Sequence, residues 1–87
     1  MDRGVTAAIR RFPQRSLEIR RLAIADSAFR SLCEDLSEAE DALARWSTLP
    51  LEQAAARRSE YDILVEELAA EIVSIVDRTT RAENGSR

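Results

Sequence analysis

The sequence predicts an all-α protein: an antiparallel helical hairpin, coiled-coil-like, with a short extra N-terminal helix. Three observations support this prediction. Two segments repeat apolar residues at alternating intervals of three and four, which is the spacing of one face of a helix. The tetrapeptide Ser-Thr-Leu-Pro at 47–50 separates the two segments. Only two Gly and two Pro occur among 87 residues, so the chain has few turns.

We expect three parts: a flexible N-terminal segment over residues 1–13, a helical hairpin domain over 14–80 and a flexible C-terminal tail over 81–87. Pro13 disfavours a helix that runs in from Phe12, and it suits the first turn of the helix that follows.

The first predicted helix covers residues 14–25, and Leu17 and Ile24 share one of its faces because they are seven residues apart. Asp26 or Ser27 can cap a new helix by accepting a hydrogen bond from an unpaired backbone N–H. We therefore expect a second helix to begin at Ser27, with a bend before it. One continuous helix through Asp26 is the alternative.

The second helix carries an apolar stripe over nearly three heptads. Its members recur at spacings of 3, 4, 3, 4 and 3, and they are Phe29, Leu32, Leu36, Ala39, Leu43 and Trp46. On its polar side, Asp41 and Arg45 are four residues apart in the favourable orientation, which predicts an ion pair between them.

The third helix is expected to begin at Pro50, with Glu52 in its first turn, and to run to about Thr79. Its stripe consists of Tyr61, Val65, Leu68, Ile72 and Ile75, extended towards the turn by Ala54 and Ala55 and widened by Leu64, Val73 and Val76. The apolar arc covers about half of the helix circumference, more than one partner helix needs.

The short connection makes the second and third helices antiparallel neighbours. At 1.5 Å per residue the third helix is longer than the second by roughly 14 Å. We place the first helix over that overhang, with Leu17, Leu22 and Ile24 covering Val73 and Val76.

The remaining apolar surface predicts association into a four-helix bundle, most simply as a homodimer. A helix of another protein would satisfy the same face. The candidate interface residues are Leu64, Val73 and Val76.

The order of residues also resembles a known family. A short helix is followed by Phe29-x-x-Leu32-x-x-x-Leu36-x-x-Ala39-Glu40-x-x-Leu43-x-Arg45, a turn, and Leu64-x-x-Glu67-Leu68. This pattern is similar to that of the YdcH-like family, small bacterial helical hairpins of unknown function. The resemblance spans roughly Phe12 to Val76. It implies the hairpin fold and possible oligomerisation, and it supplies no catalytic residues.

Composition argues against an enzyme. The chain has no His and a single Cys, so the commonest general base and metal ligand are missing. Cys33 has no His to activate it, and we interpret it as a small apolar packing residue. Glu34, Glu38 and Asp41 share one helix face, but a solvated face explains them better than a metal site. We therefore expect no cofactor, no metal and no small-molecule substrate.

No apolar run is long enough for a membrane span, and the N-terminus lacks the apolar core of a secretory signal, so we expect a cytoplasmic protein. Charge is uneven: residues 1–25 hold six Arg and two acids, whereas 26–87 hold seven Arg and fourteen acids.

The basic cluster comprises Arg10, Arg11, Arg15, Arg20 and Arg21. As the alternative function, a small regulator would use this cluster to bind nucleic acid or an anionic surface. The acidic character of the rest of the chain and the lack of a recognition motif argue against nucleic acid.

Overall fold

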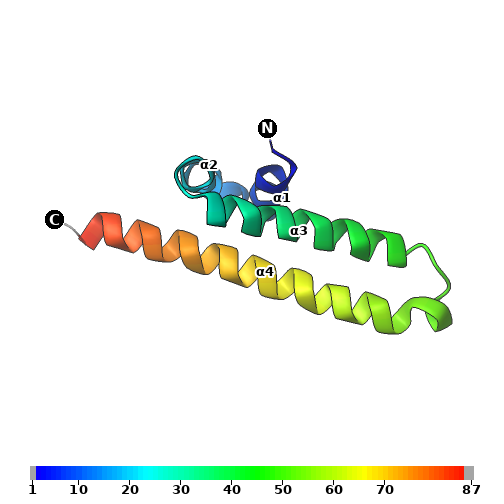
Figure 1. Cartoon of the computed structure of the whole chain (residues 1–87). Helices are drawn as coiled ribbons and strands as arrows, with labels where there is room; N and C mark the ends of the chain where they lie inside the picture. The colour runs from blue at the N-terminus through cyan, green and yellow to red at the C-terminus, as the bar shows by residue number, and fades with distance from the viewer. Residues whose placement is uncertain (1, 86–87) are drawn as a thin grey trace.

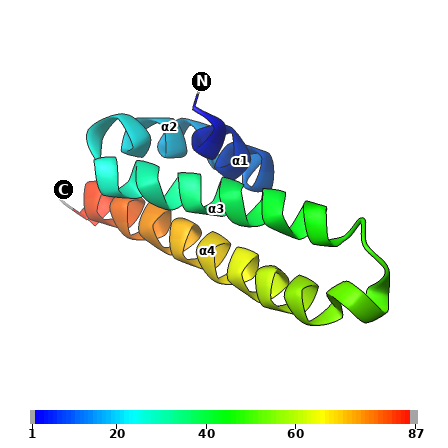
Figure 2. The same cartoon turned by 45° about the vertical axis from the view of Figure 1, so that its right-hand side comes forward.

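Two long antiparallel helices form the body of the molecule. The computed structural model describes residues 2–85, and within that range it contains four α-helices and no strand. Helix α3 spans Ser27–Trp46 and helix α4 spans Leu51–Gly85, and they lie side by side in both views (Figures 1 and 2). The 35 residues of α4 account for the longest dimension of the molecule, 55 Å.

The shared core of α3 and α4 follows the predicted stripes. Phe29, Leu36 and Ala39 of α3 and Val65 and Ile72 of α4 are all buried. Four further stripe residues, Leu32, Leu43, Leu68 and Ile75, are partly buried against them, and the last two, Trp46 and Tyr61, are half-buried outside this core cluster. The predicted all-α fold is therefore confirmed, and its hairpin is the pair α3–α4.

The bend between the first and second predicted helices is also present. Helix α2 spans Ser16–Ala25 after a 3₁₀ turn at Pro13–Arg15. Asp26 has an extended backbone, and its Oδ1 accepts hydrogen bonds from the backbone N–H groups of Ala28 at 2.9 Å and Phe29 at 3.2 Å. The cap starts α3 at Ser27, so the alternative of one continuous helix is wrong.

Helix α2 packs with a different face from the predicted one. Leu17 and Ile24 are 58% and 85% exposed, whereas Ile19 and Ala23 are buried. The helix has apolar residues on two sides, and only one of them can face the hairpin. Leu22 does lie beside Val76 in the overhang, as expected, because both line the same hollow between α2 and α4.

A fourth helix replaces the flexible segment expected over residues 1–13. Helix α1 spans Arg3–Arg11, and Asp2 caps it by accepting a hydrogen bond from the backbone N–H of Gly4 at 2.7 Å. Its buried residues are Gly4, Val5, Ala7 and Ala8. Met1, also part of the expected segment, lies outside the described residues. Helices α1 and α2 gather over the half of the hairpin away from the turn (Figures 1 and 2).

Small side chains allow α1 to lie directly on α3. A Cβ atom on Gly4 would lie 2.5 Å from the backbone nitrogen of Glu34 and 2.6 Å from the carbonyl carbon of Cys33. Since real Cβ atoms do not approach backbone so closely, the crossing of the two helices requires glycine.

Helix α4 also continues beyond the expected end at Thr79. Residues 81–85 of the expected flexible tail are helical, and Ser86 and Arg87 lie outside the described residues. No Gly or Pro interrupts the chain between Leu51 and Gly85, and Thr79 and Thr80 are half-buried near α2. Contact with α2 thus supports the last turns of α4.

Candidate functional site

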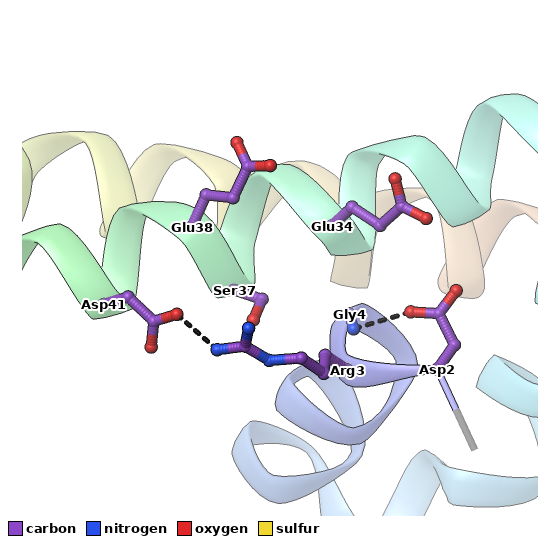
Figure 3. Close-up of a pocket in the computed structure, with 7 residues that line it drawn as sticks. All are labelled: Asp2, Arg3, Gly4, Glu34, Ser37, Glu38 and Asp41. Carbon is purple, nitrogen blue, oxygen red and sulfur yellow. Dashed lines mark hydrogen bonds and ion pairs between the residues drawn. The ribbon is translucent and has the colours of Figure 1, made fainter.

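The acidic face singled out in the sequence borders a hollow between α1 and α3. The hollow has a volume of about 310 Å³, and Figure 3 shows its lining: Asp2, Arg3, Gly4, Glu34, Ser37, Glu38 and Asp41. The Arg3 guanidinium donates to Asp41 Oδ2 at 2.6 Å, and Asp2 is occupied as the cap of α1. No group of three or more metal-ligating side chains converges within residues 2–85. Asp2 therefore starts α1 and Asp41 helps to hold it on α3, whereas Glu34 and Glu38 are exposed and form no ion pair among residues 2–85.

Asp41 does not form the predicted ion pair with Arg45. Its carboxylate is bound by Arg3 instead, because α1 places the Arg3 side chain beside it (Figure 3). Arg45 consequently makes no ion pair within the described part of the chain, and its side chain is exposed.

Cys33 lies beneath α1 and is fully buried. Burial, with smaller contributions from the charges of Asp2 and Glu34, raises the pKa of its thiol to about 11. The thiol is therefore protonated at neutral pH and acts as the packing residue predicted from the sequence.

Two of the five candidate arginines hold the fold together. Arg11 lies between Glu40 of α3, at 3.5 Å, and Glu66 of α4. Arg15 contacts both Glu18 and Asp77. The arginine pairs thus connect α1, α2, α3 and α4, and these two side chains are not available to an anionic partner.

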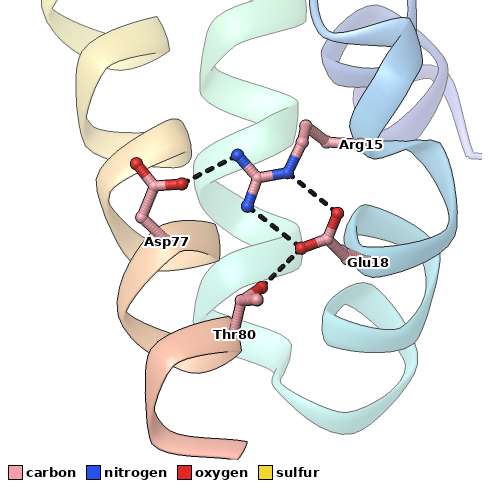
Figure 4. A network of polar contacts seen from close by, with 4 residues as sticks. All are labelled: Arg15, Glu18, Asp77 and Thr80. Carbon is pink, nitrogen blue, oxygen red and sulfur yellow. Dashed lines mark hydrogen bonds and ion pairs between the residues drawn. The ribbon is translucent and has the colours of Figure 1, made fainter. Parts of the chain in front are cut away.

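The Arg15 pairs belong to a network that fastens α2 to the end of α4 (Figure 4). Arg15 donates from Nε to Glu18 Oε1 at 2.8 Å and from its terminal nitrogens to Glu18 Oε2 at 3.0 Å and Asp77 Oδ1 at 2.7 Å. The Thr80 hydroxyl donates to Glu18 as well. The hydrogen bonds that Glu18 accepts, first those from Arg15 and then the one from Thr80, lower the pKa of its carboxyl group to about 2.

The other three candidate arginines, Arg10, Arg20 and Arg21, are exposed. None of them forms an ion pair among residues 2–85. Arg20 and Arg21 lie on the same face of α2 as the exposed residues Leu17 and Ile24, because the four stand at relative positions i, i+3, i+4 and i+7. We call this set the α2 stripe: Leu17, Arg20, Arg21 and Ile24.

The three candidate interface residues do not lie together. Val76 is 1% exposed and belongs to the core beside α2, so its proposed place on a free face is wrong. Val73 is half-buried and lies on the same side of α4 as Glu66 and Asp77, which bind the arginines of α1 and the 3₁₀ turn. Only Leu64, 40% exposed, faces away from α1 and α2.

Leu64 borders a groove that the sequence analysis did not identify. It has a volume of about 470 Å³ and runs between α3 and α4, lined by Asp35, Glu38, Ala39, Ala42, Arg45, Tyr61, Leu64 and Leu68. We call it the α3–α4 groove. Ala39 and Ala42 form a buried floor, and Tyr61 and Leu68 are half-buried walls.

The α3–α4 groove lies on the side of the hairpin opposite to α1 and α2. Leu64 precedes Glu66, the partner of Arg11, by two residues, a rotation of about 200° around α4. Asp35 follows Cys33, which lies beneath Gly4, by the same rotation around α3. The sequence signal for the groove was Ala42, a small residue beside the α3 stripe that leaves room against Tyr61 and Leu64.

No helix within residues 2–85 combines the length and the apolar character that crossing a bilayer requires. Comparisons with models of protein families, with curated proteins and with solved structures found no match to this chain.

Proposed function

We propose that this chain is a non-catalytic helical interaction module that self-associates into a helical bundle through the α3–α4 groove. The observation that carries the proposal is the groove itself. It joins exposed and half-buried apolar side chains to flanking charges on one open side of the hairpin, while α1 and α2 cover the other side.

The hairpin leaves part of its apolar surface uncovered. Leu64 is 40% exposed, and Tyr61 and Leu68 are only partly covered. Burial of a fully exposed side chain of this size stabilises by roughly 1.5 to 3 kcal/mol, so covering the fraction still exposed contributes a part of that for each residue. A symmetric dimer counts each contribution twice. Chains of this size bury a modest fraction of their surface alone, so association adds stability that the single copy lacks.

Sedimentation equilibrium over a range of concentrations tests the proposal. We expect the wild type to self-associate and Leu64→Glu to weaken association by at least about tenfold, because the variant places a charge in the apolar interface. Ile63→Glu is the matched control, since Ile63 is 60% exposed on another side of α4. A wild type that stays monomeric at every concentration, or two variants with equal effects, would overturn the proposal.

The α2 stripe supports a second candidate function, binding to an anionic surface or nucleic acid. Leu17 and Ile24 are exposed beside Arg20 and Arg21, and no acidic residue lies between them on that face. An amphipathic helix with this arrangement suits a negatively charged surface.

Two binding assays at low salt separate this second function from the first: co-sedimentation with anionic and with uncharged lipid vesicles, and binding to generic nucleic acid. The variant Arg20→Glu/Arg21→Glu should abolish binding. The control Arg78→Glu/Arg81→Glu changes the net charge equally on exposed positions of α4. If the two double variants bind equally, or the wild type binds neither target, the second candidate is eliminated.

A further inference from the structure

The charged residues of the α3–α4 groove are separated by sign along α3. Asp35 and Glu38 lie towards one end and Arg45 towards the other. At 1.5 Å per residue, Arg45 is roughly 15 Å from the level of Asp35 and roughly 10 Å from that of Glu38. None of the three forms an ion pair within the described part of the chain. The groove therefore has an acidic end and a basic end, both available to a partner.

The apolar lining is centred between these ends. The lining of α3 runs from 35 to 45 and that of α4 from 61 to 68. The two helices are antiparallel (Figures 1 and 2). The middle of the first lining range, position 40, therefore lies level with the middle of the second, next to Leu64. Leu64 is also the most exposed apolar residue of the groove.

From this arrangement we infer that the occupant of the groove is a second copy of this chain, docked about a two-fold axis that passes beside Leu64. A two-fold interface must be self-complementary, with residue i of one copy against residue j of the other and j against i. Rotation about this axis brings Arg45 of each copy to Asp35 and Glu38 of the other. It also places the two Leu64 side chains together over the floor of Ala39 and Ala42.

The charges favour this occupant over the α2 stripe of another copy. The stripe presents Arg20 and Arg21, which suit Asp35 and Glu38, but it holds no acidic residue that could pair with Arg45. The small floor residues also permit the close approach of two helix pairs that a four-helix bundle requires. The inference rests on the proposed self-association and adds its symmetry and its contacts.

Charge reversal on exposed residues tests the axis. Asp35→Arg alone and Arg45→Glu alone each place like charges at both ends of a symmetric dimer. We expect each variant to self-associate at least about tenfold more weakly than the wild type at low salt. In an equimolar mixture both ends become complementary again, so a mixed dimer should form with nearly wild-type affinity. Sedimentation equilibrium gives the affinities, and native mass spectrometry identifies the mixed species.

Glu52→Arg, an exposed reversal on α4 outside the groove lining, is the matched control and should associate like the wild type. If the wild type dimerises but the mixture gains nothing over the single variants, or the single variants associate normally, the two-fold arrangement is wrong while self-association stands. If the wild type is monomeric throughout, the proposed function fails and this inference fails with it.

Discussion

The two sides of the α3–α4 hairpin differ in how they are completed. On one side, α1 and α2 cover the hairpin with Gly4 against the α3 backbone and with the Arg11 and Arg15 ion pairs. On the other side, the groove leaves Leu64 exposed and its flanking charges unpaired among residues 2–85. The wide apolar arc of α4 therefore serves two purposes, since part of it receives the chain's own N-terminal helices. Only the remainder is open to a partner.

The largest expected effect is on the free energy of unfolding, and it should differ between a residue on the covered side, Val76, and one on the open side, Leu64. Val76→Ala removes two methyl groups from a position that is 1% exposed beside α2, and should lower the free energy of unfolding by about 2 to 3 kcal/mol. Leu64→Ala should lower it less, by about 1 kcal/mol at concentrations where the chain is monomeric, because 40% of the residue is already exposed to water. Urea denaturation at low concentration measures both, and similar values for the two would erase the distinction between the sides.

The next prediction concerns the contact of α1 with α3. Helix propensity alone predicts that Gly4→Ala stabilises by up to about 1 kcal/mol. The backbone contact predicts the opposite, a loss of about 1 to 3 kcal/mol, because the new Cβ would lie 2.5 Å from the Glu34 nitrogen. The sign of the change in urea denaturation decides between them, and Ser31→Ala at an exposed position of α3 serves as the control.

A smaller effect should appear as a pH dependence of the stability that the Glu18 network between α2 and α4 contributes. The pKa of Glu18 falls from its usual 4.5 to about 2 in the folded chain, so its carboxylate stabilises the fold above pH 4.5. That contribution is lost progressively as the pH falls from 4.5 to 2. Thermal unfolding of the wild type and Glu18→Gln should therefore differ most at neutral pH and converge near pH 2. Glu67→Gln, at an exposed position of α4, should not reproduce this convergence.

The smallest effect concerns the rate at which Cys33 is alkylated, not the stability of the fold. Cys33 is buried and its thiol pKa is raised to about 11, so alkylation by a small thiol reagent at neutral pH should require that α1 open first. Gly4→Ala should accelerate the reaction, and Leu64→Glu should leave it unchanged at concentrations where the chain is monomeric. Rapid alkylation of the folded wild type would show that α1 does not protect Cys33.

Local sequence signals determined most of the hairpin. The alternating spacing of Phe29, Leu36 and Ala39, the cap at Asp26 and the break at Pro50 act over one or two helical turns, so their consequences are visible without the fold. For the same reason the sequence predicted that α4 carries more apolar surface than α3 alone can cover.

Only the tertiary structure decided which part of that apolar surface α1 and α2 cover and which part stays open. The nine-residue α1 is too short to be stable alone and forms because small residues let it pack on α3. Helix α2 offers two apolar sides, and docking through Glu18 and Thr80 selects Ile19 over Leu17 for burial. The packing of α1 on α3 likewise pairs Asp41 with Arg3 and so leaves Arg45 open beside the groove. These outcomes depend on contacts between residues far apart in the chain, which spacing along one helix does not encode.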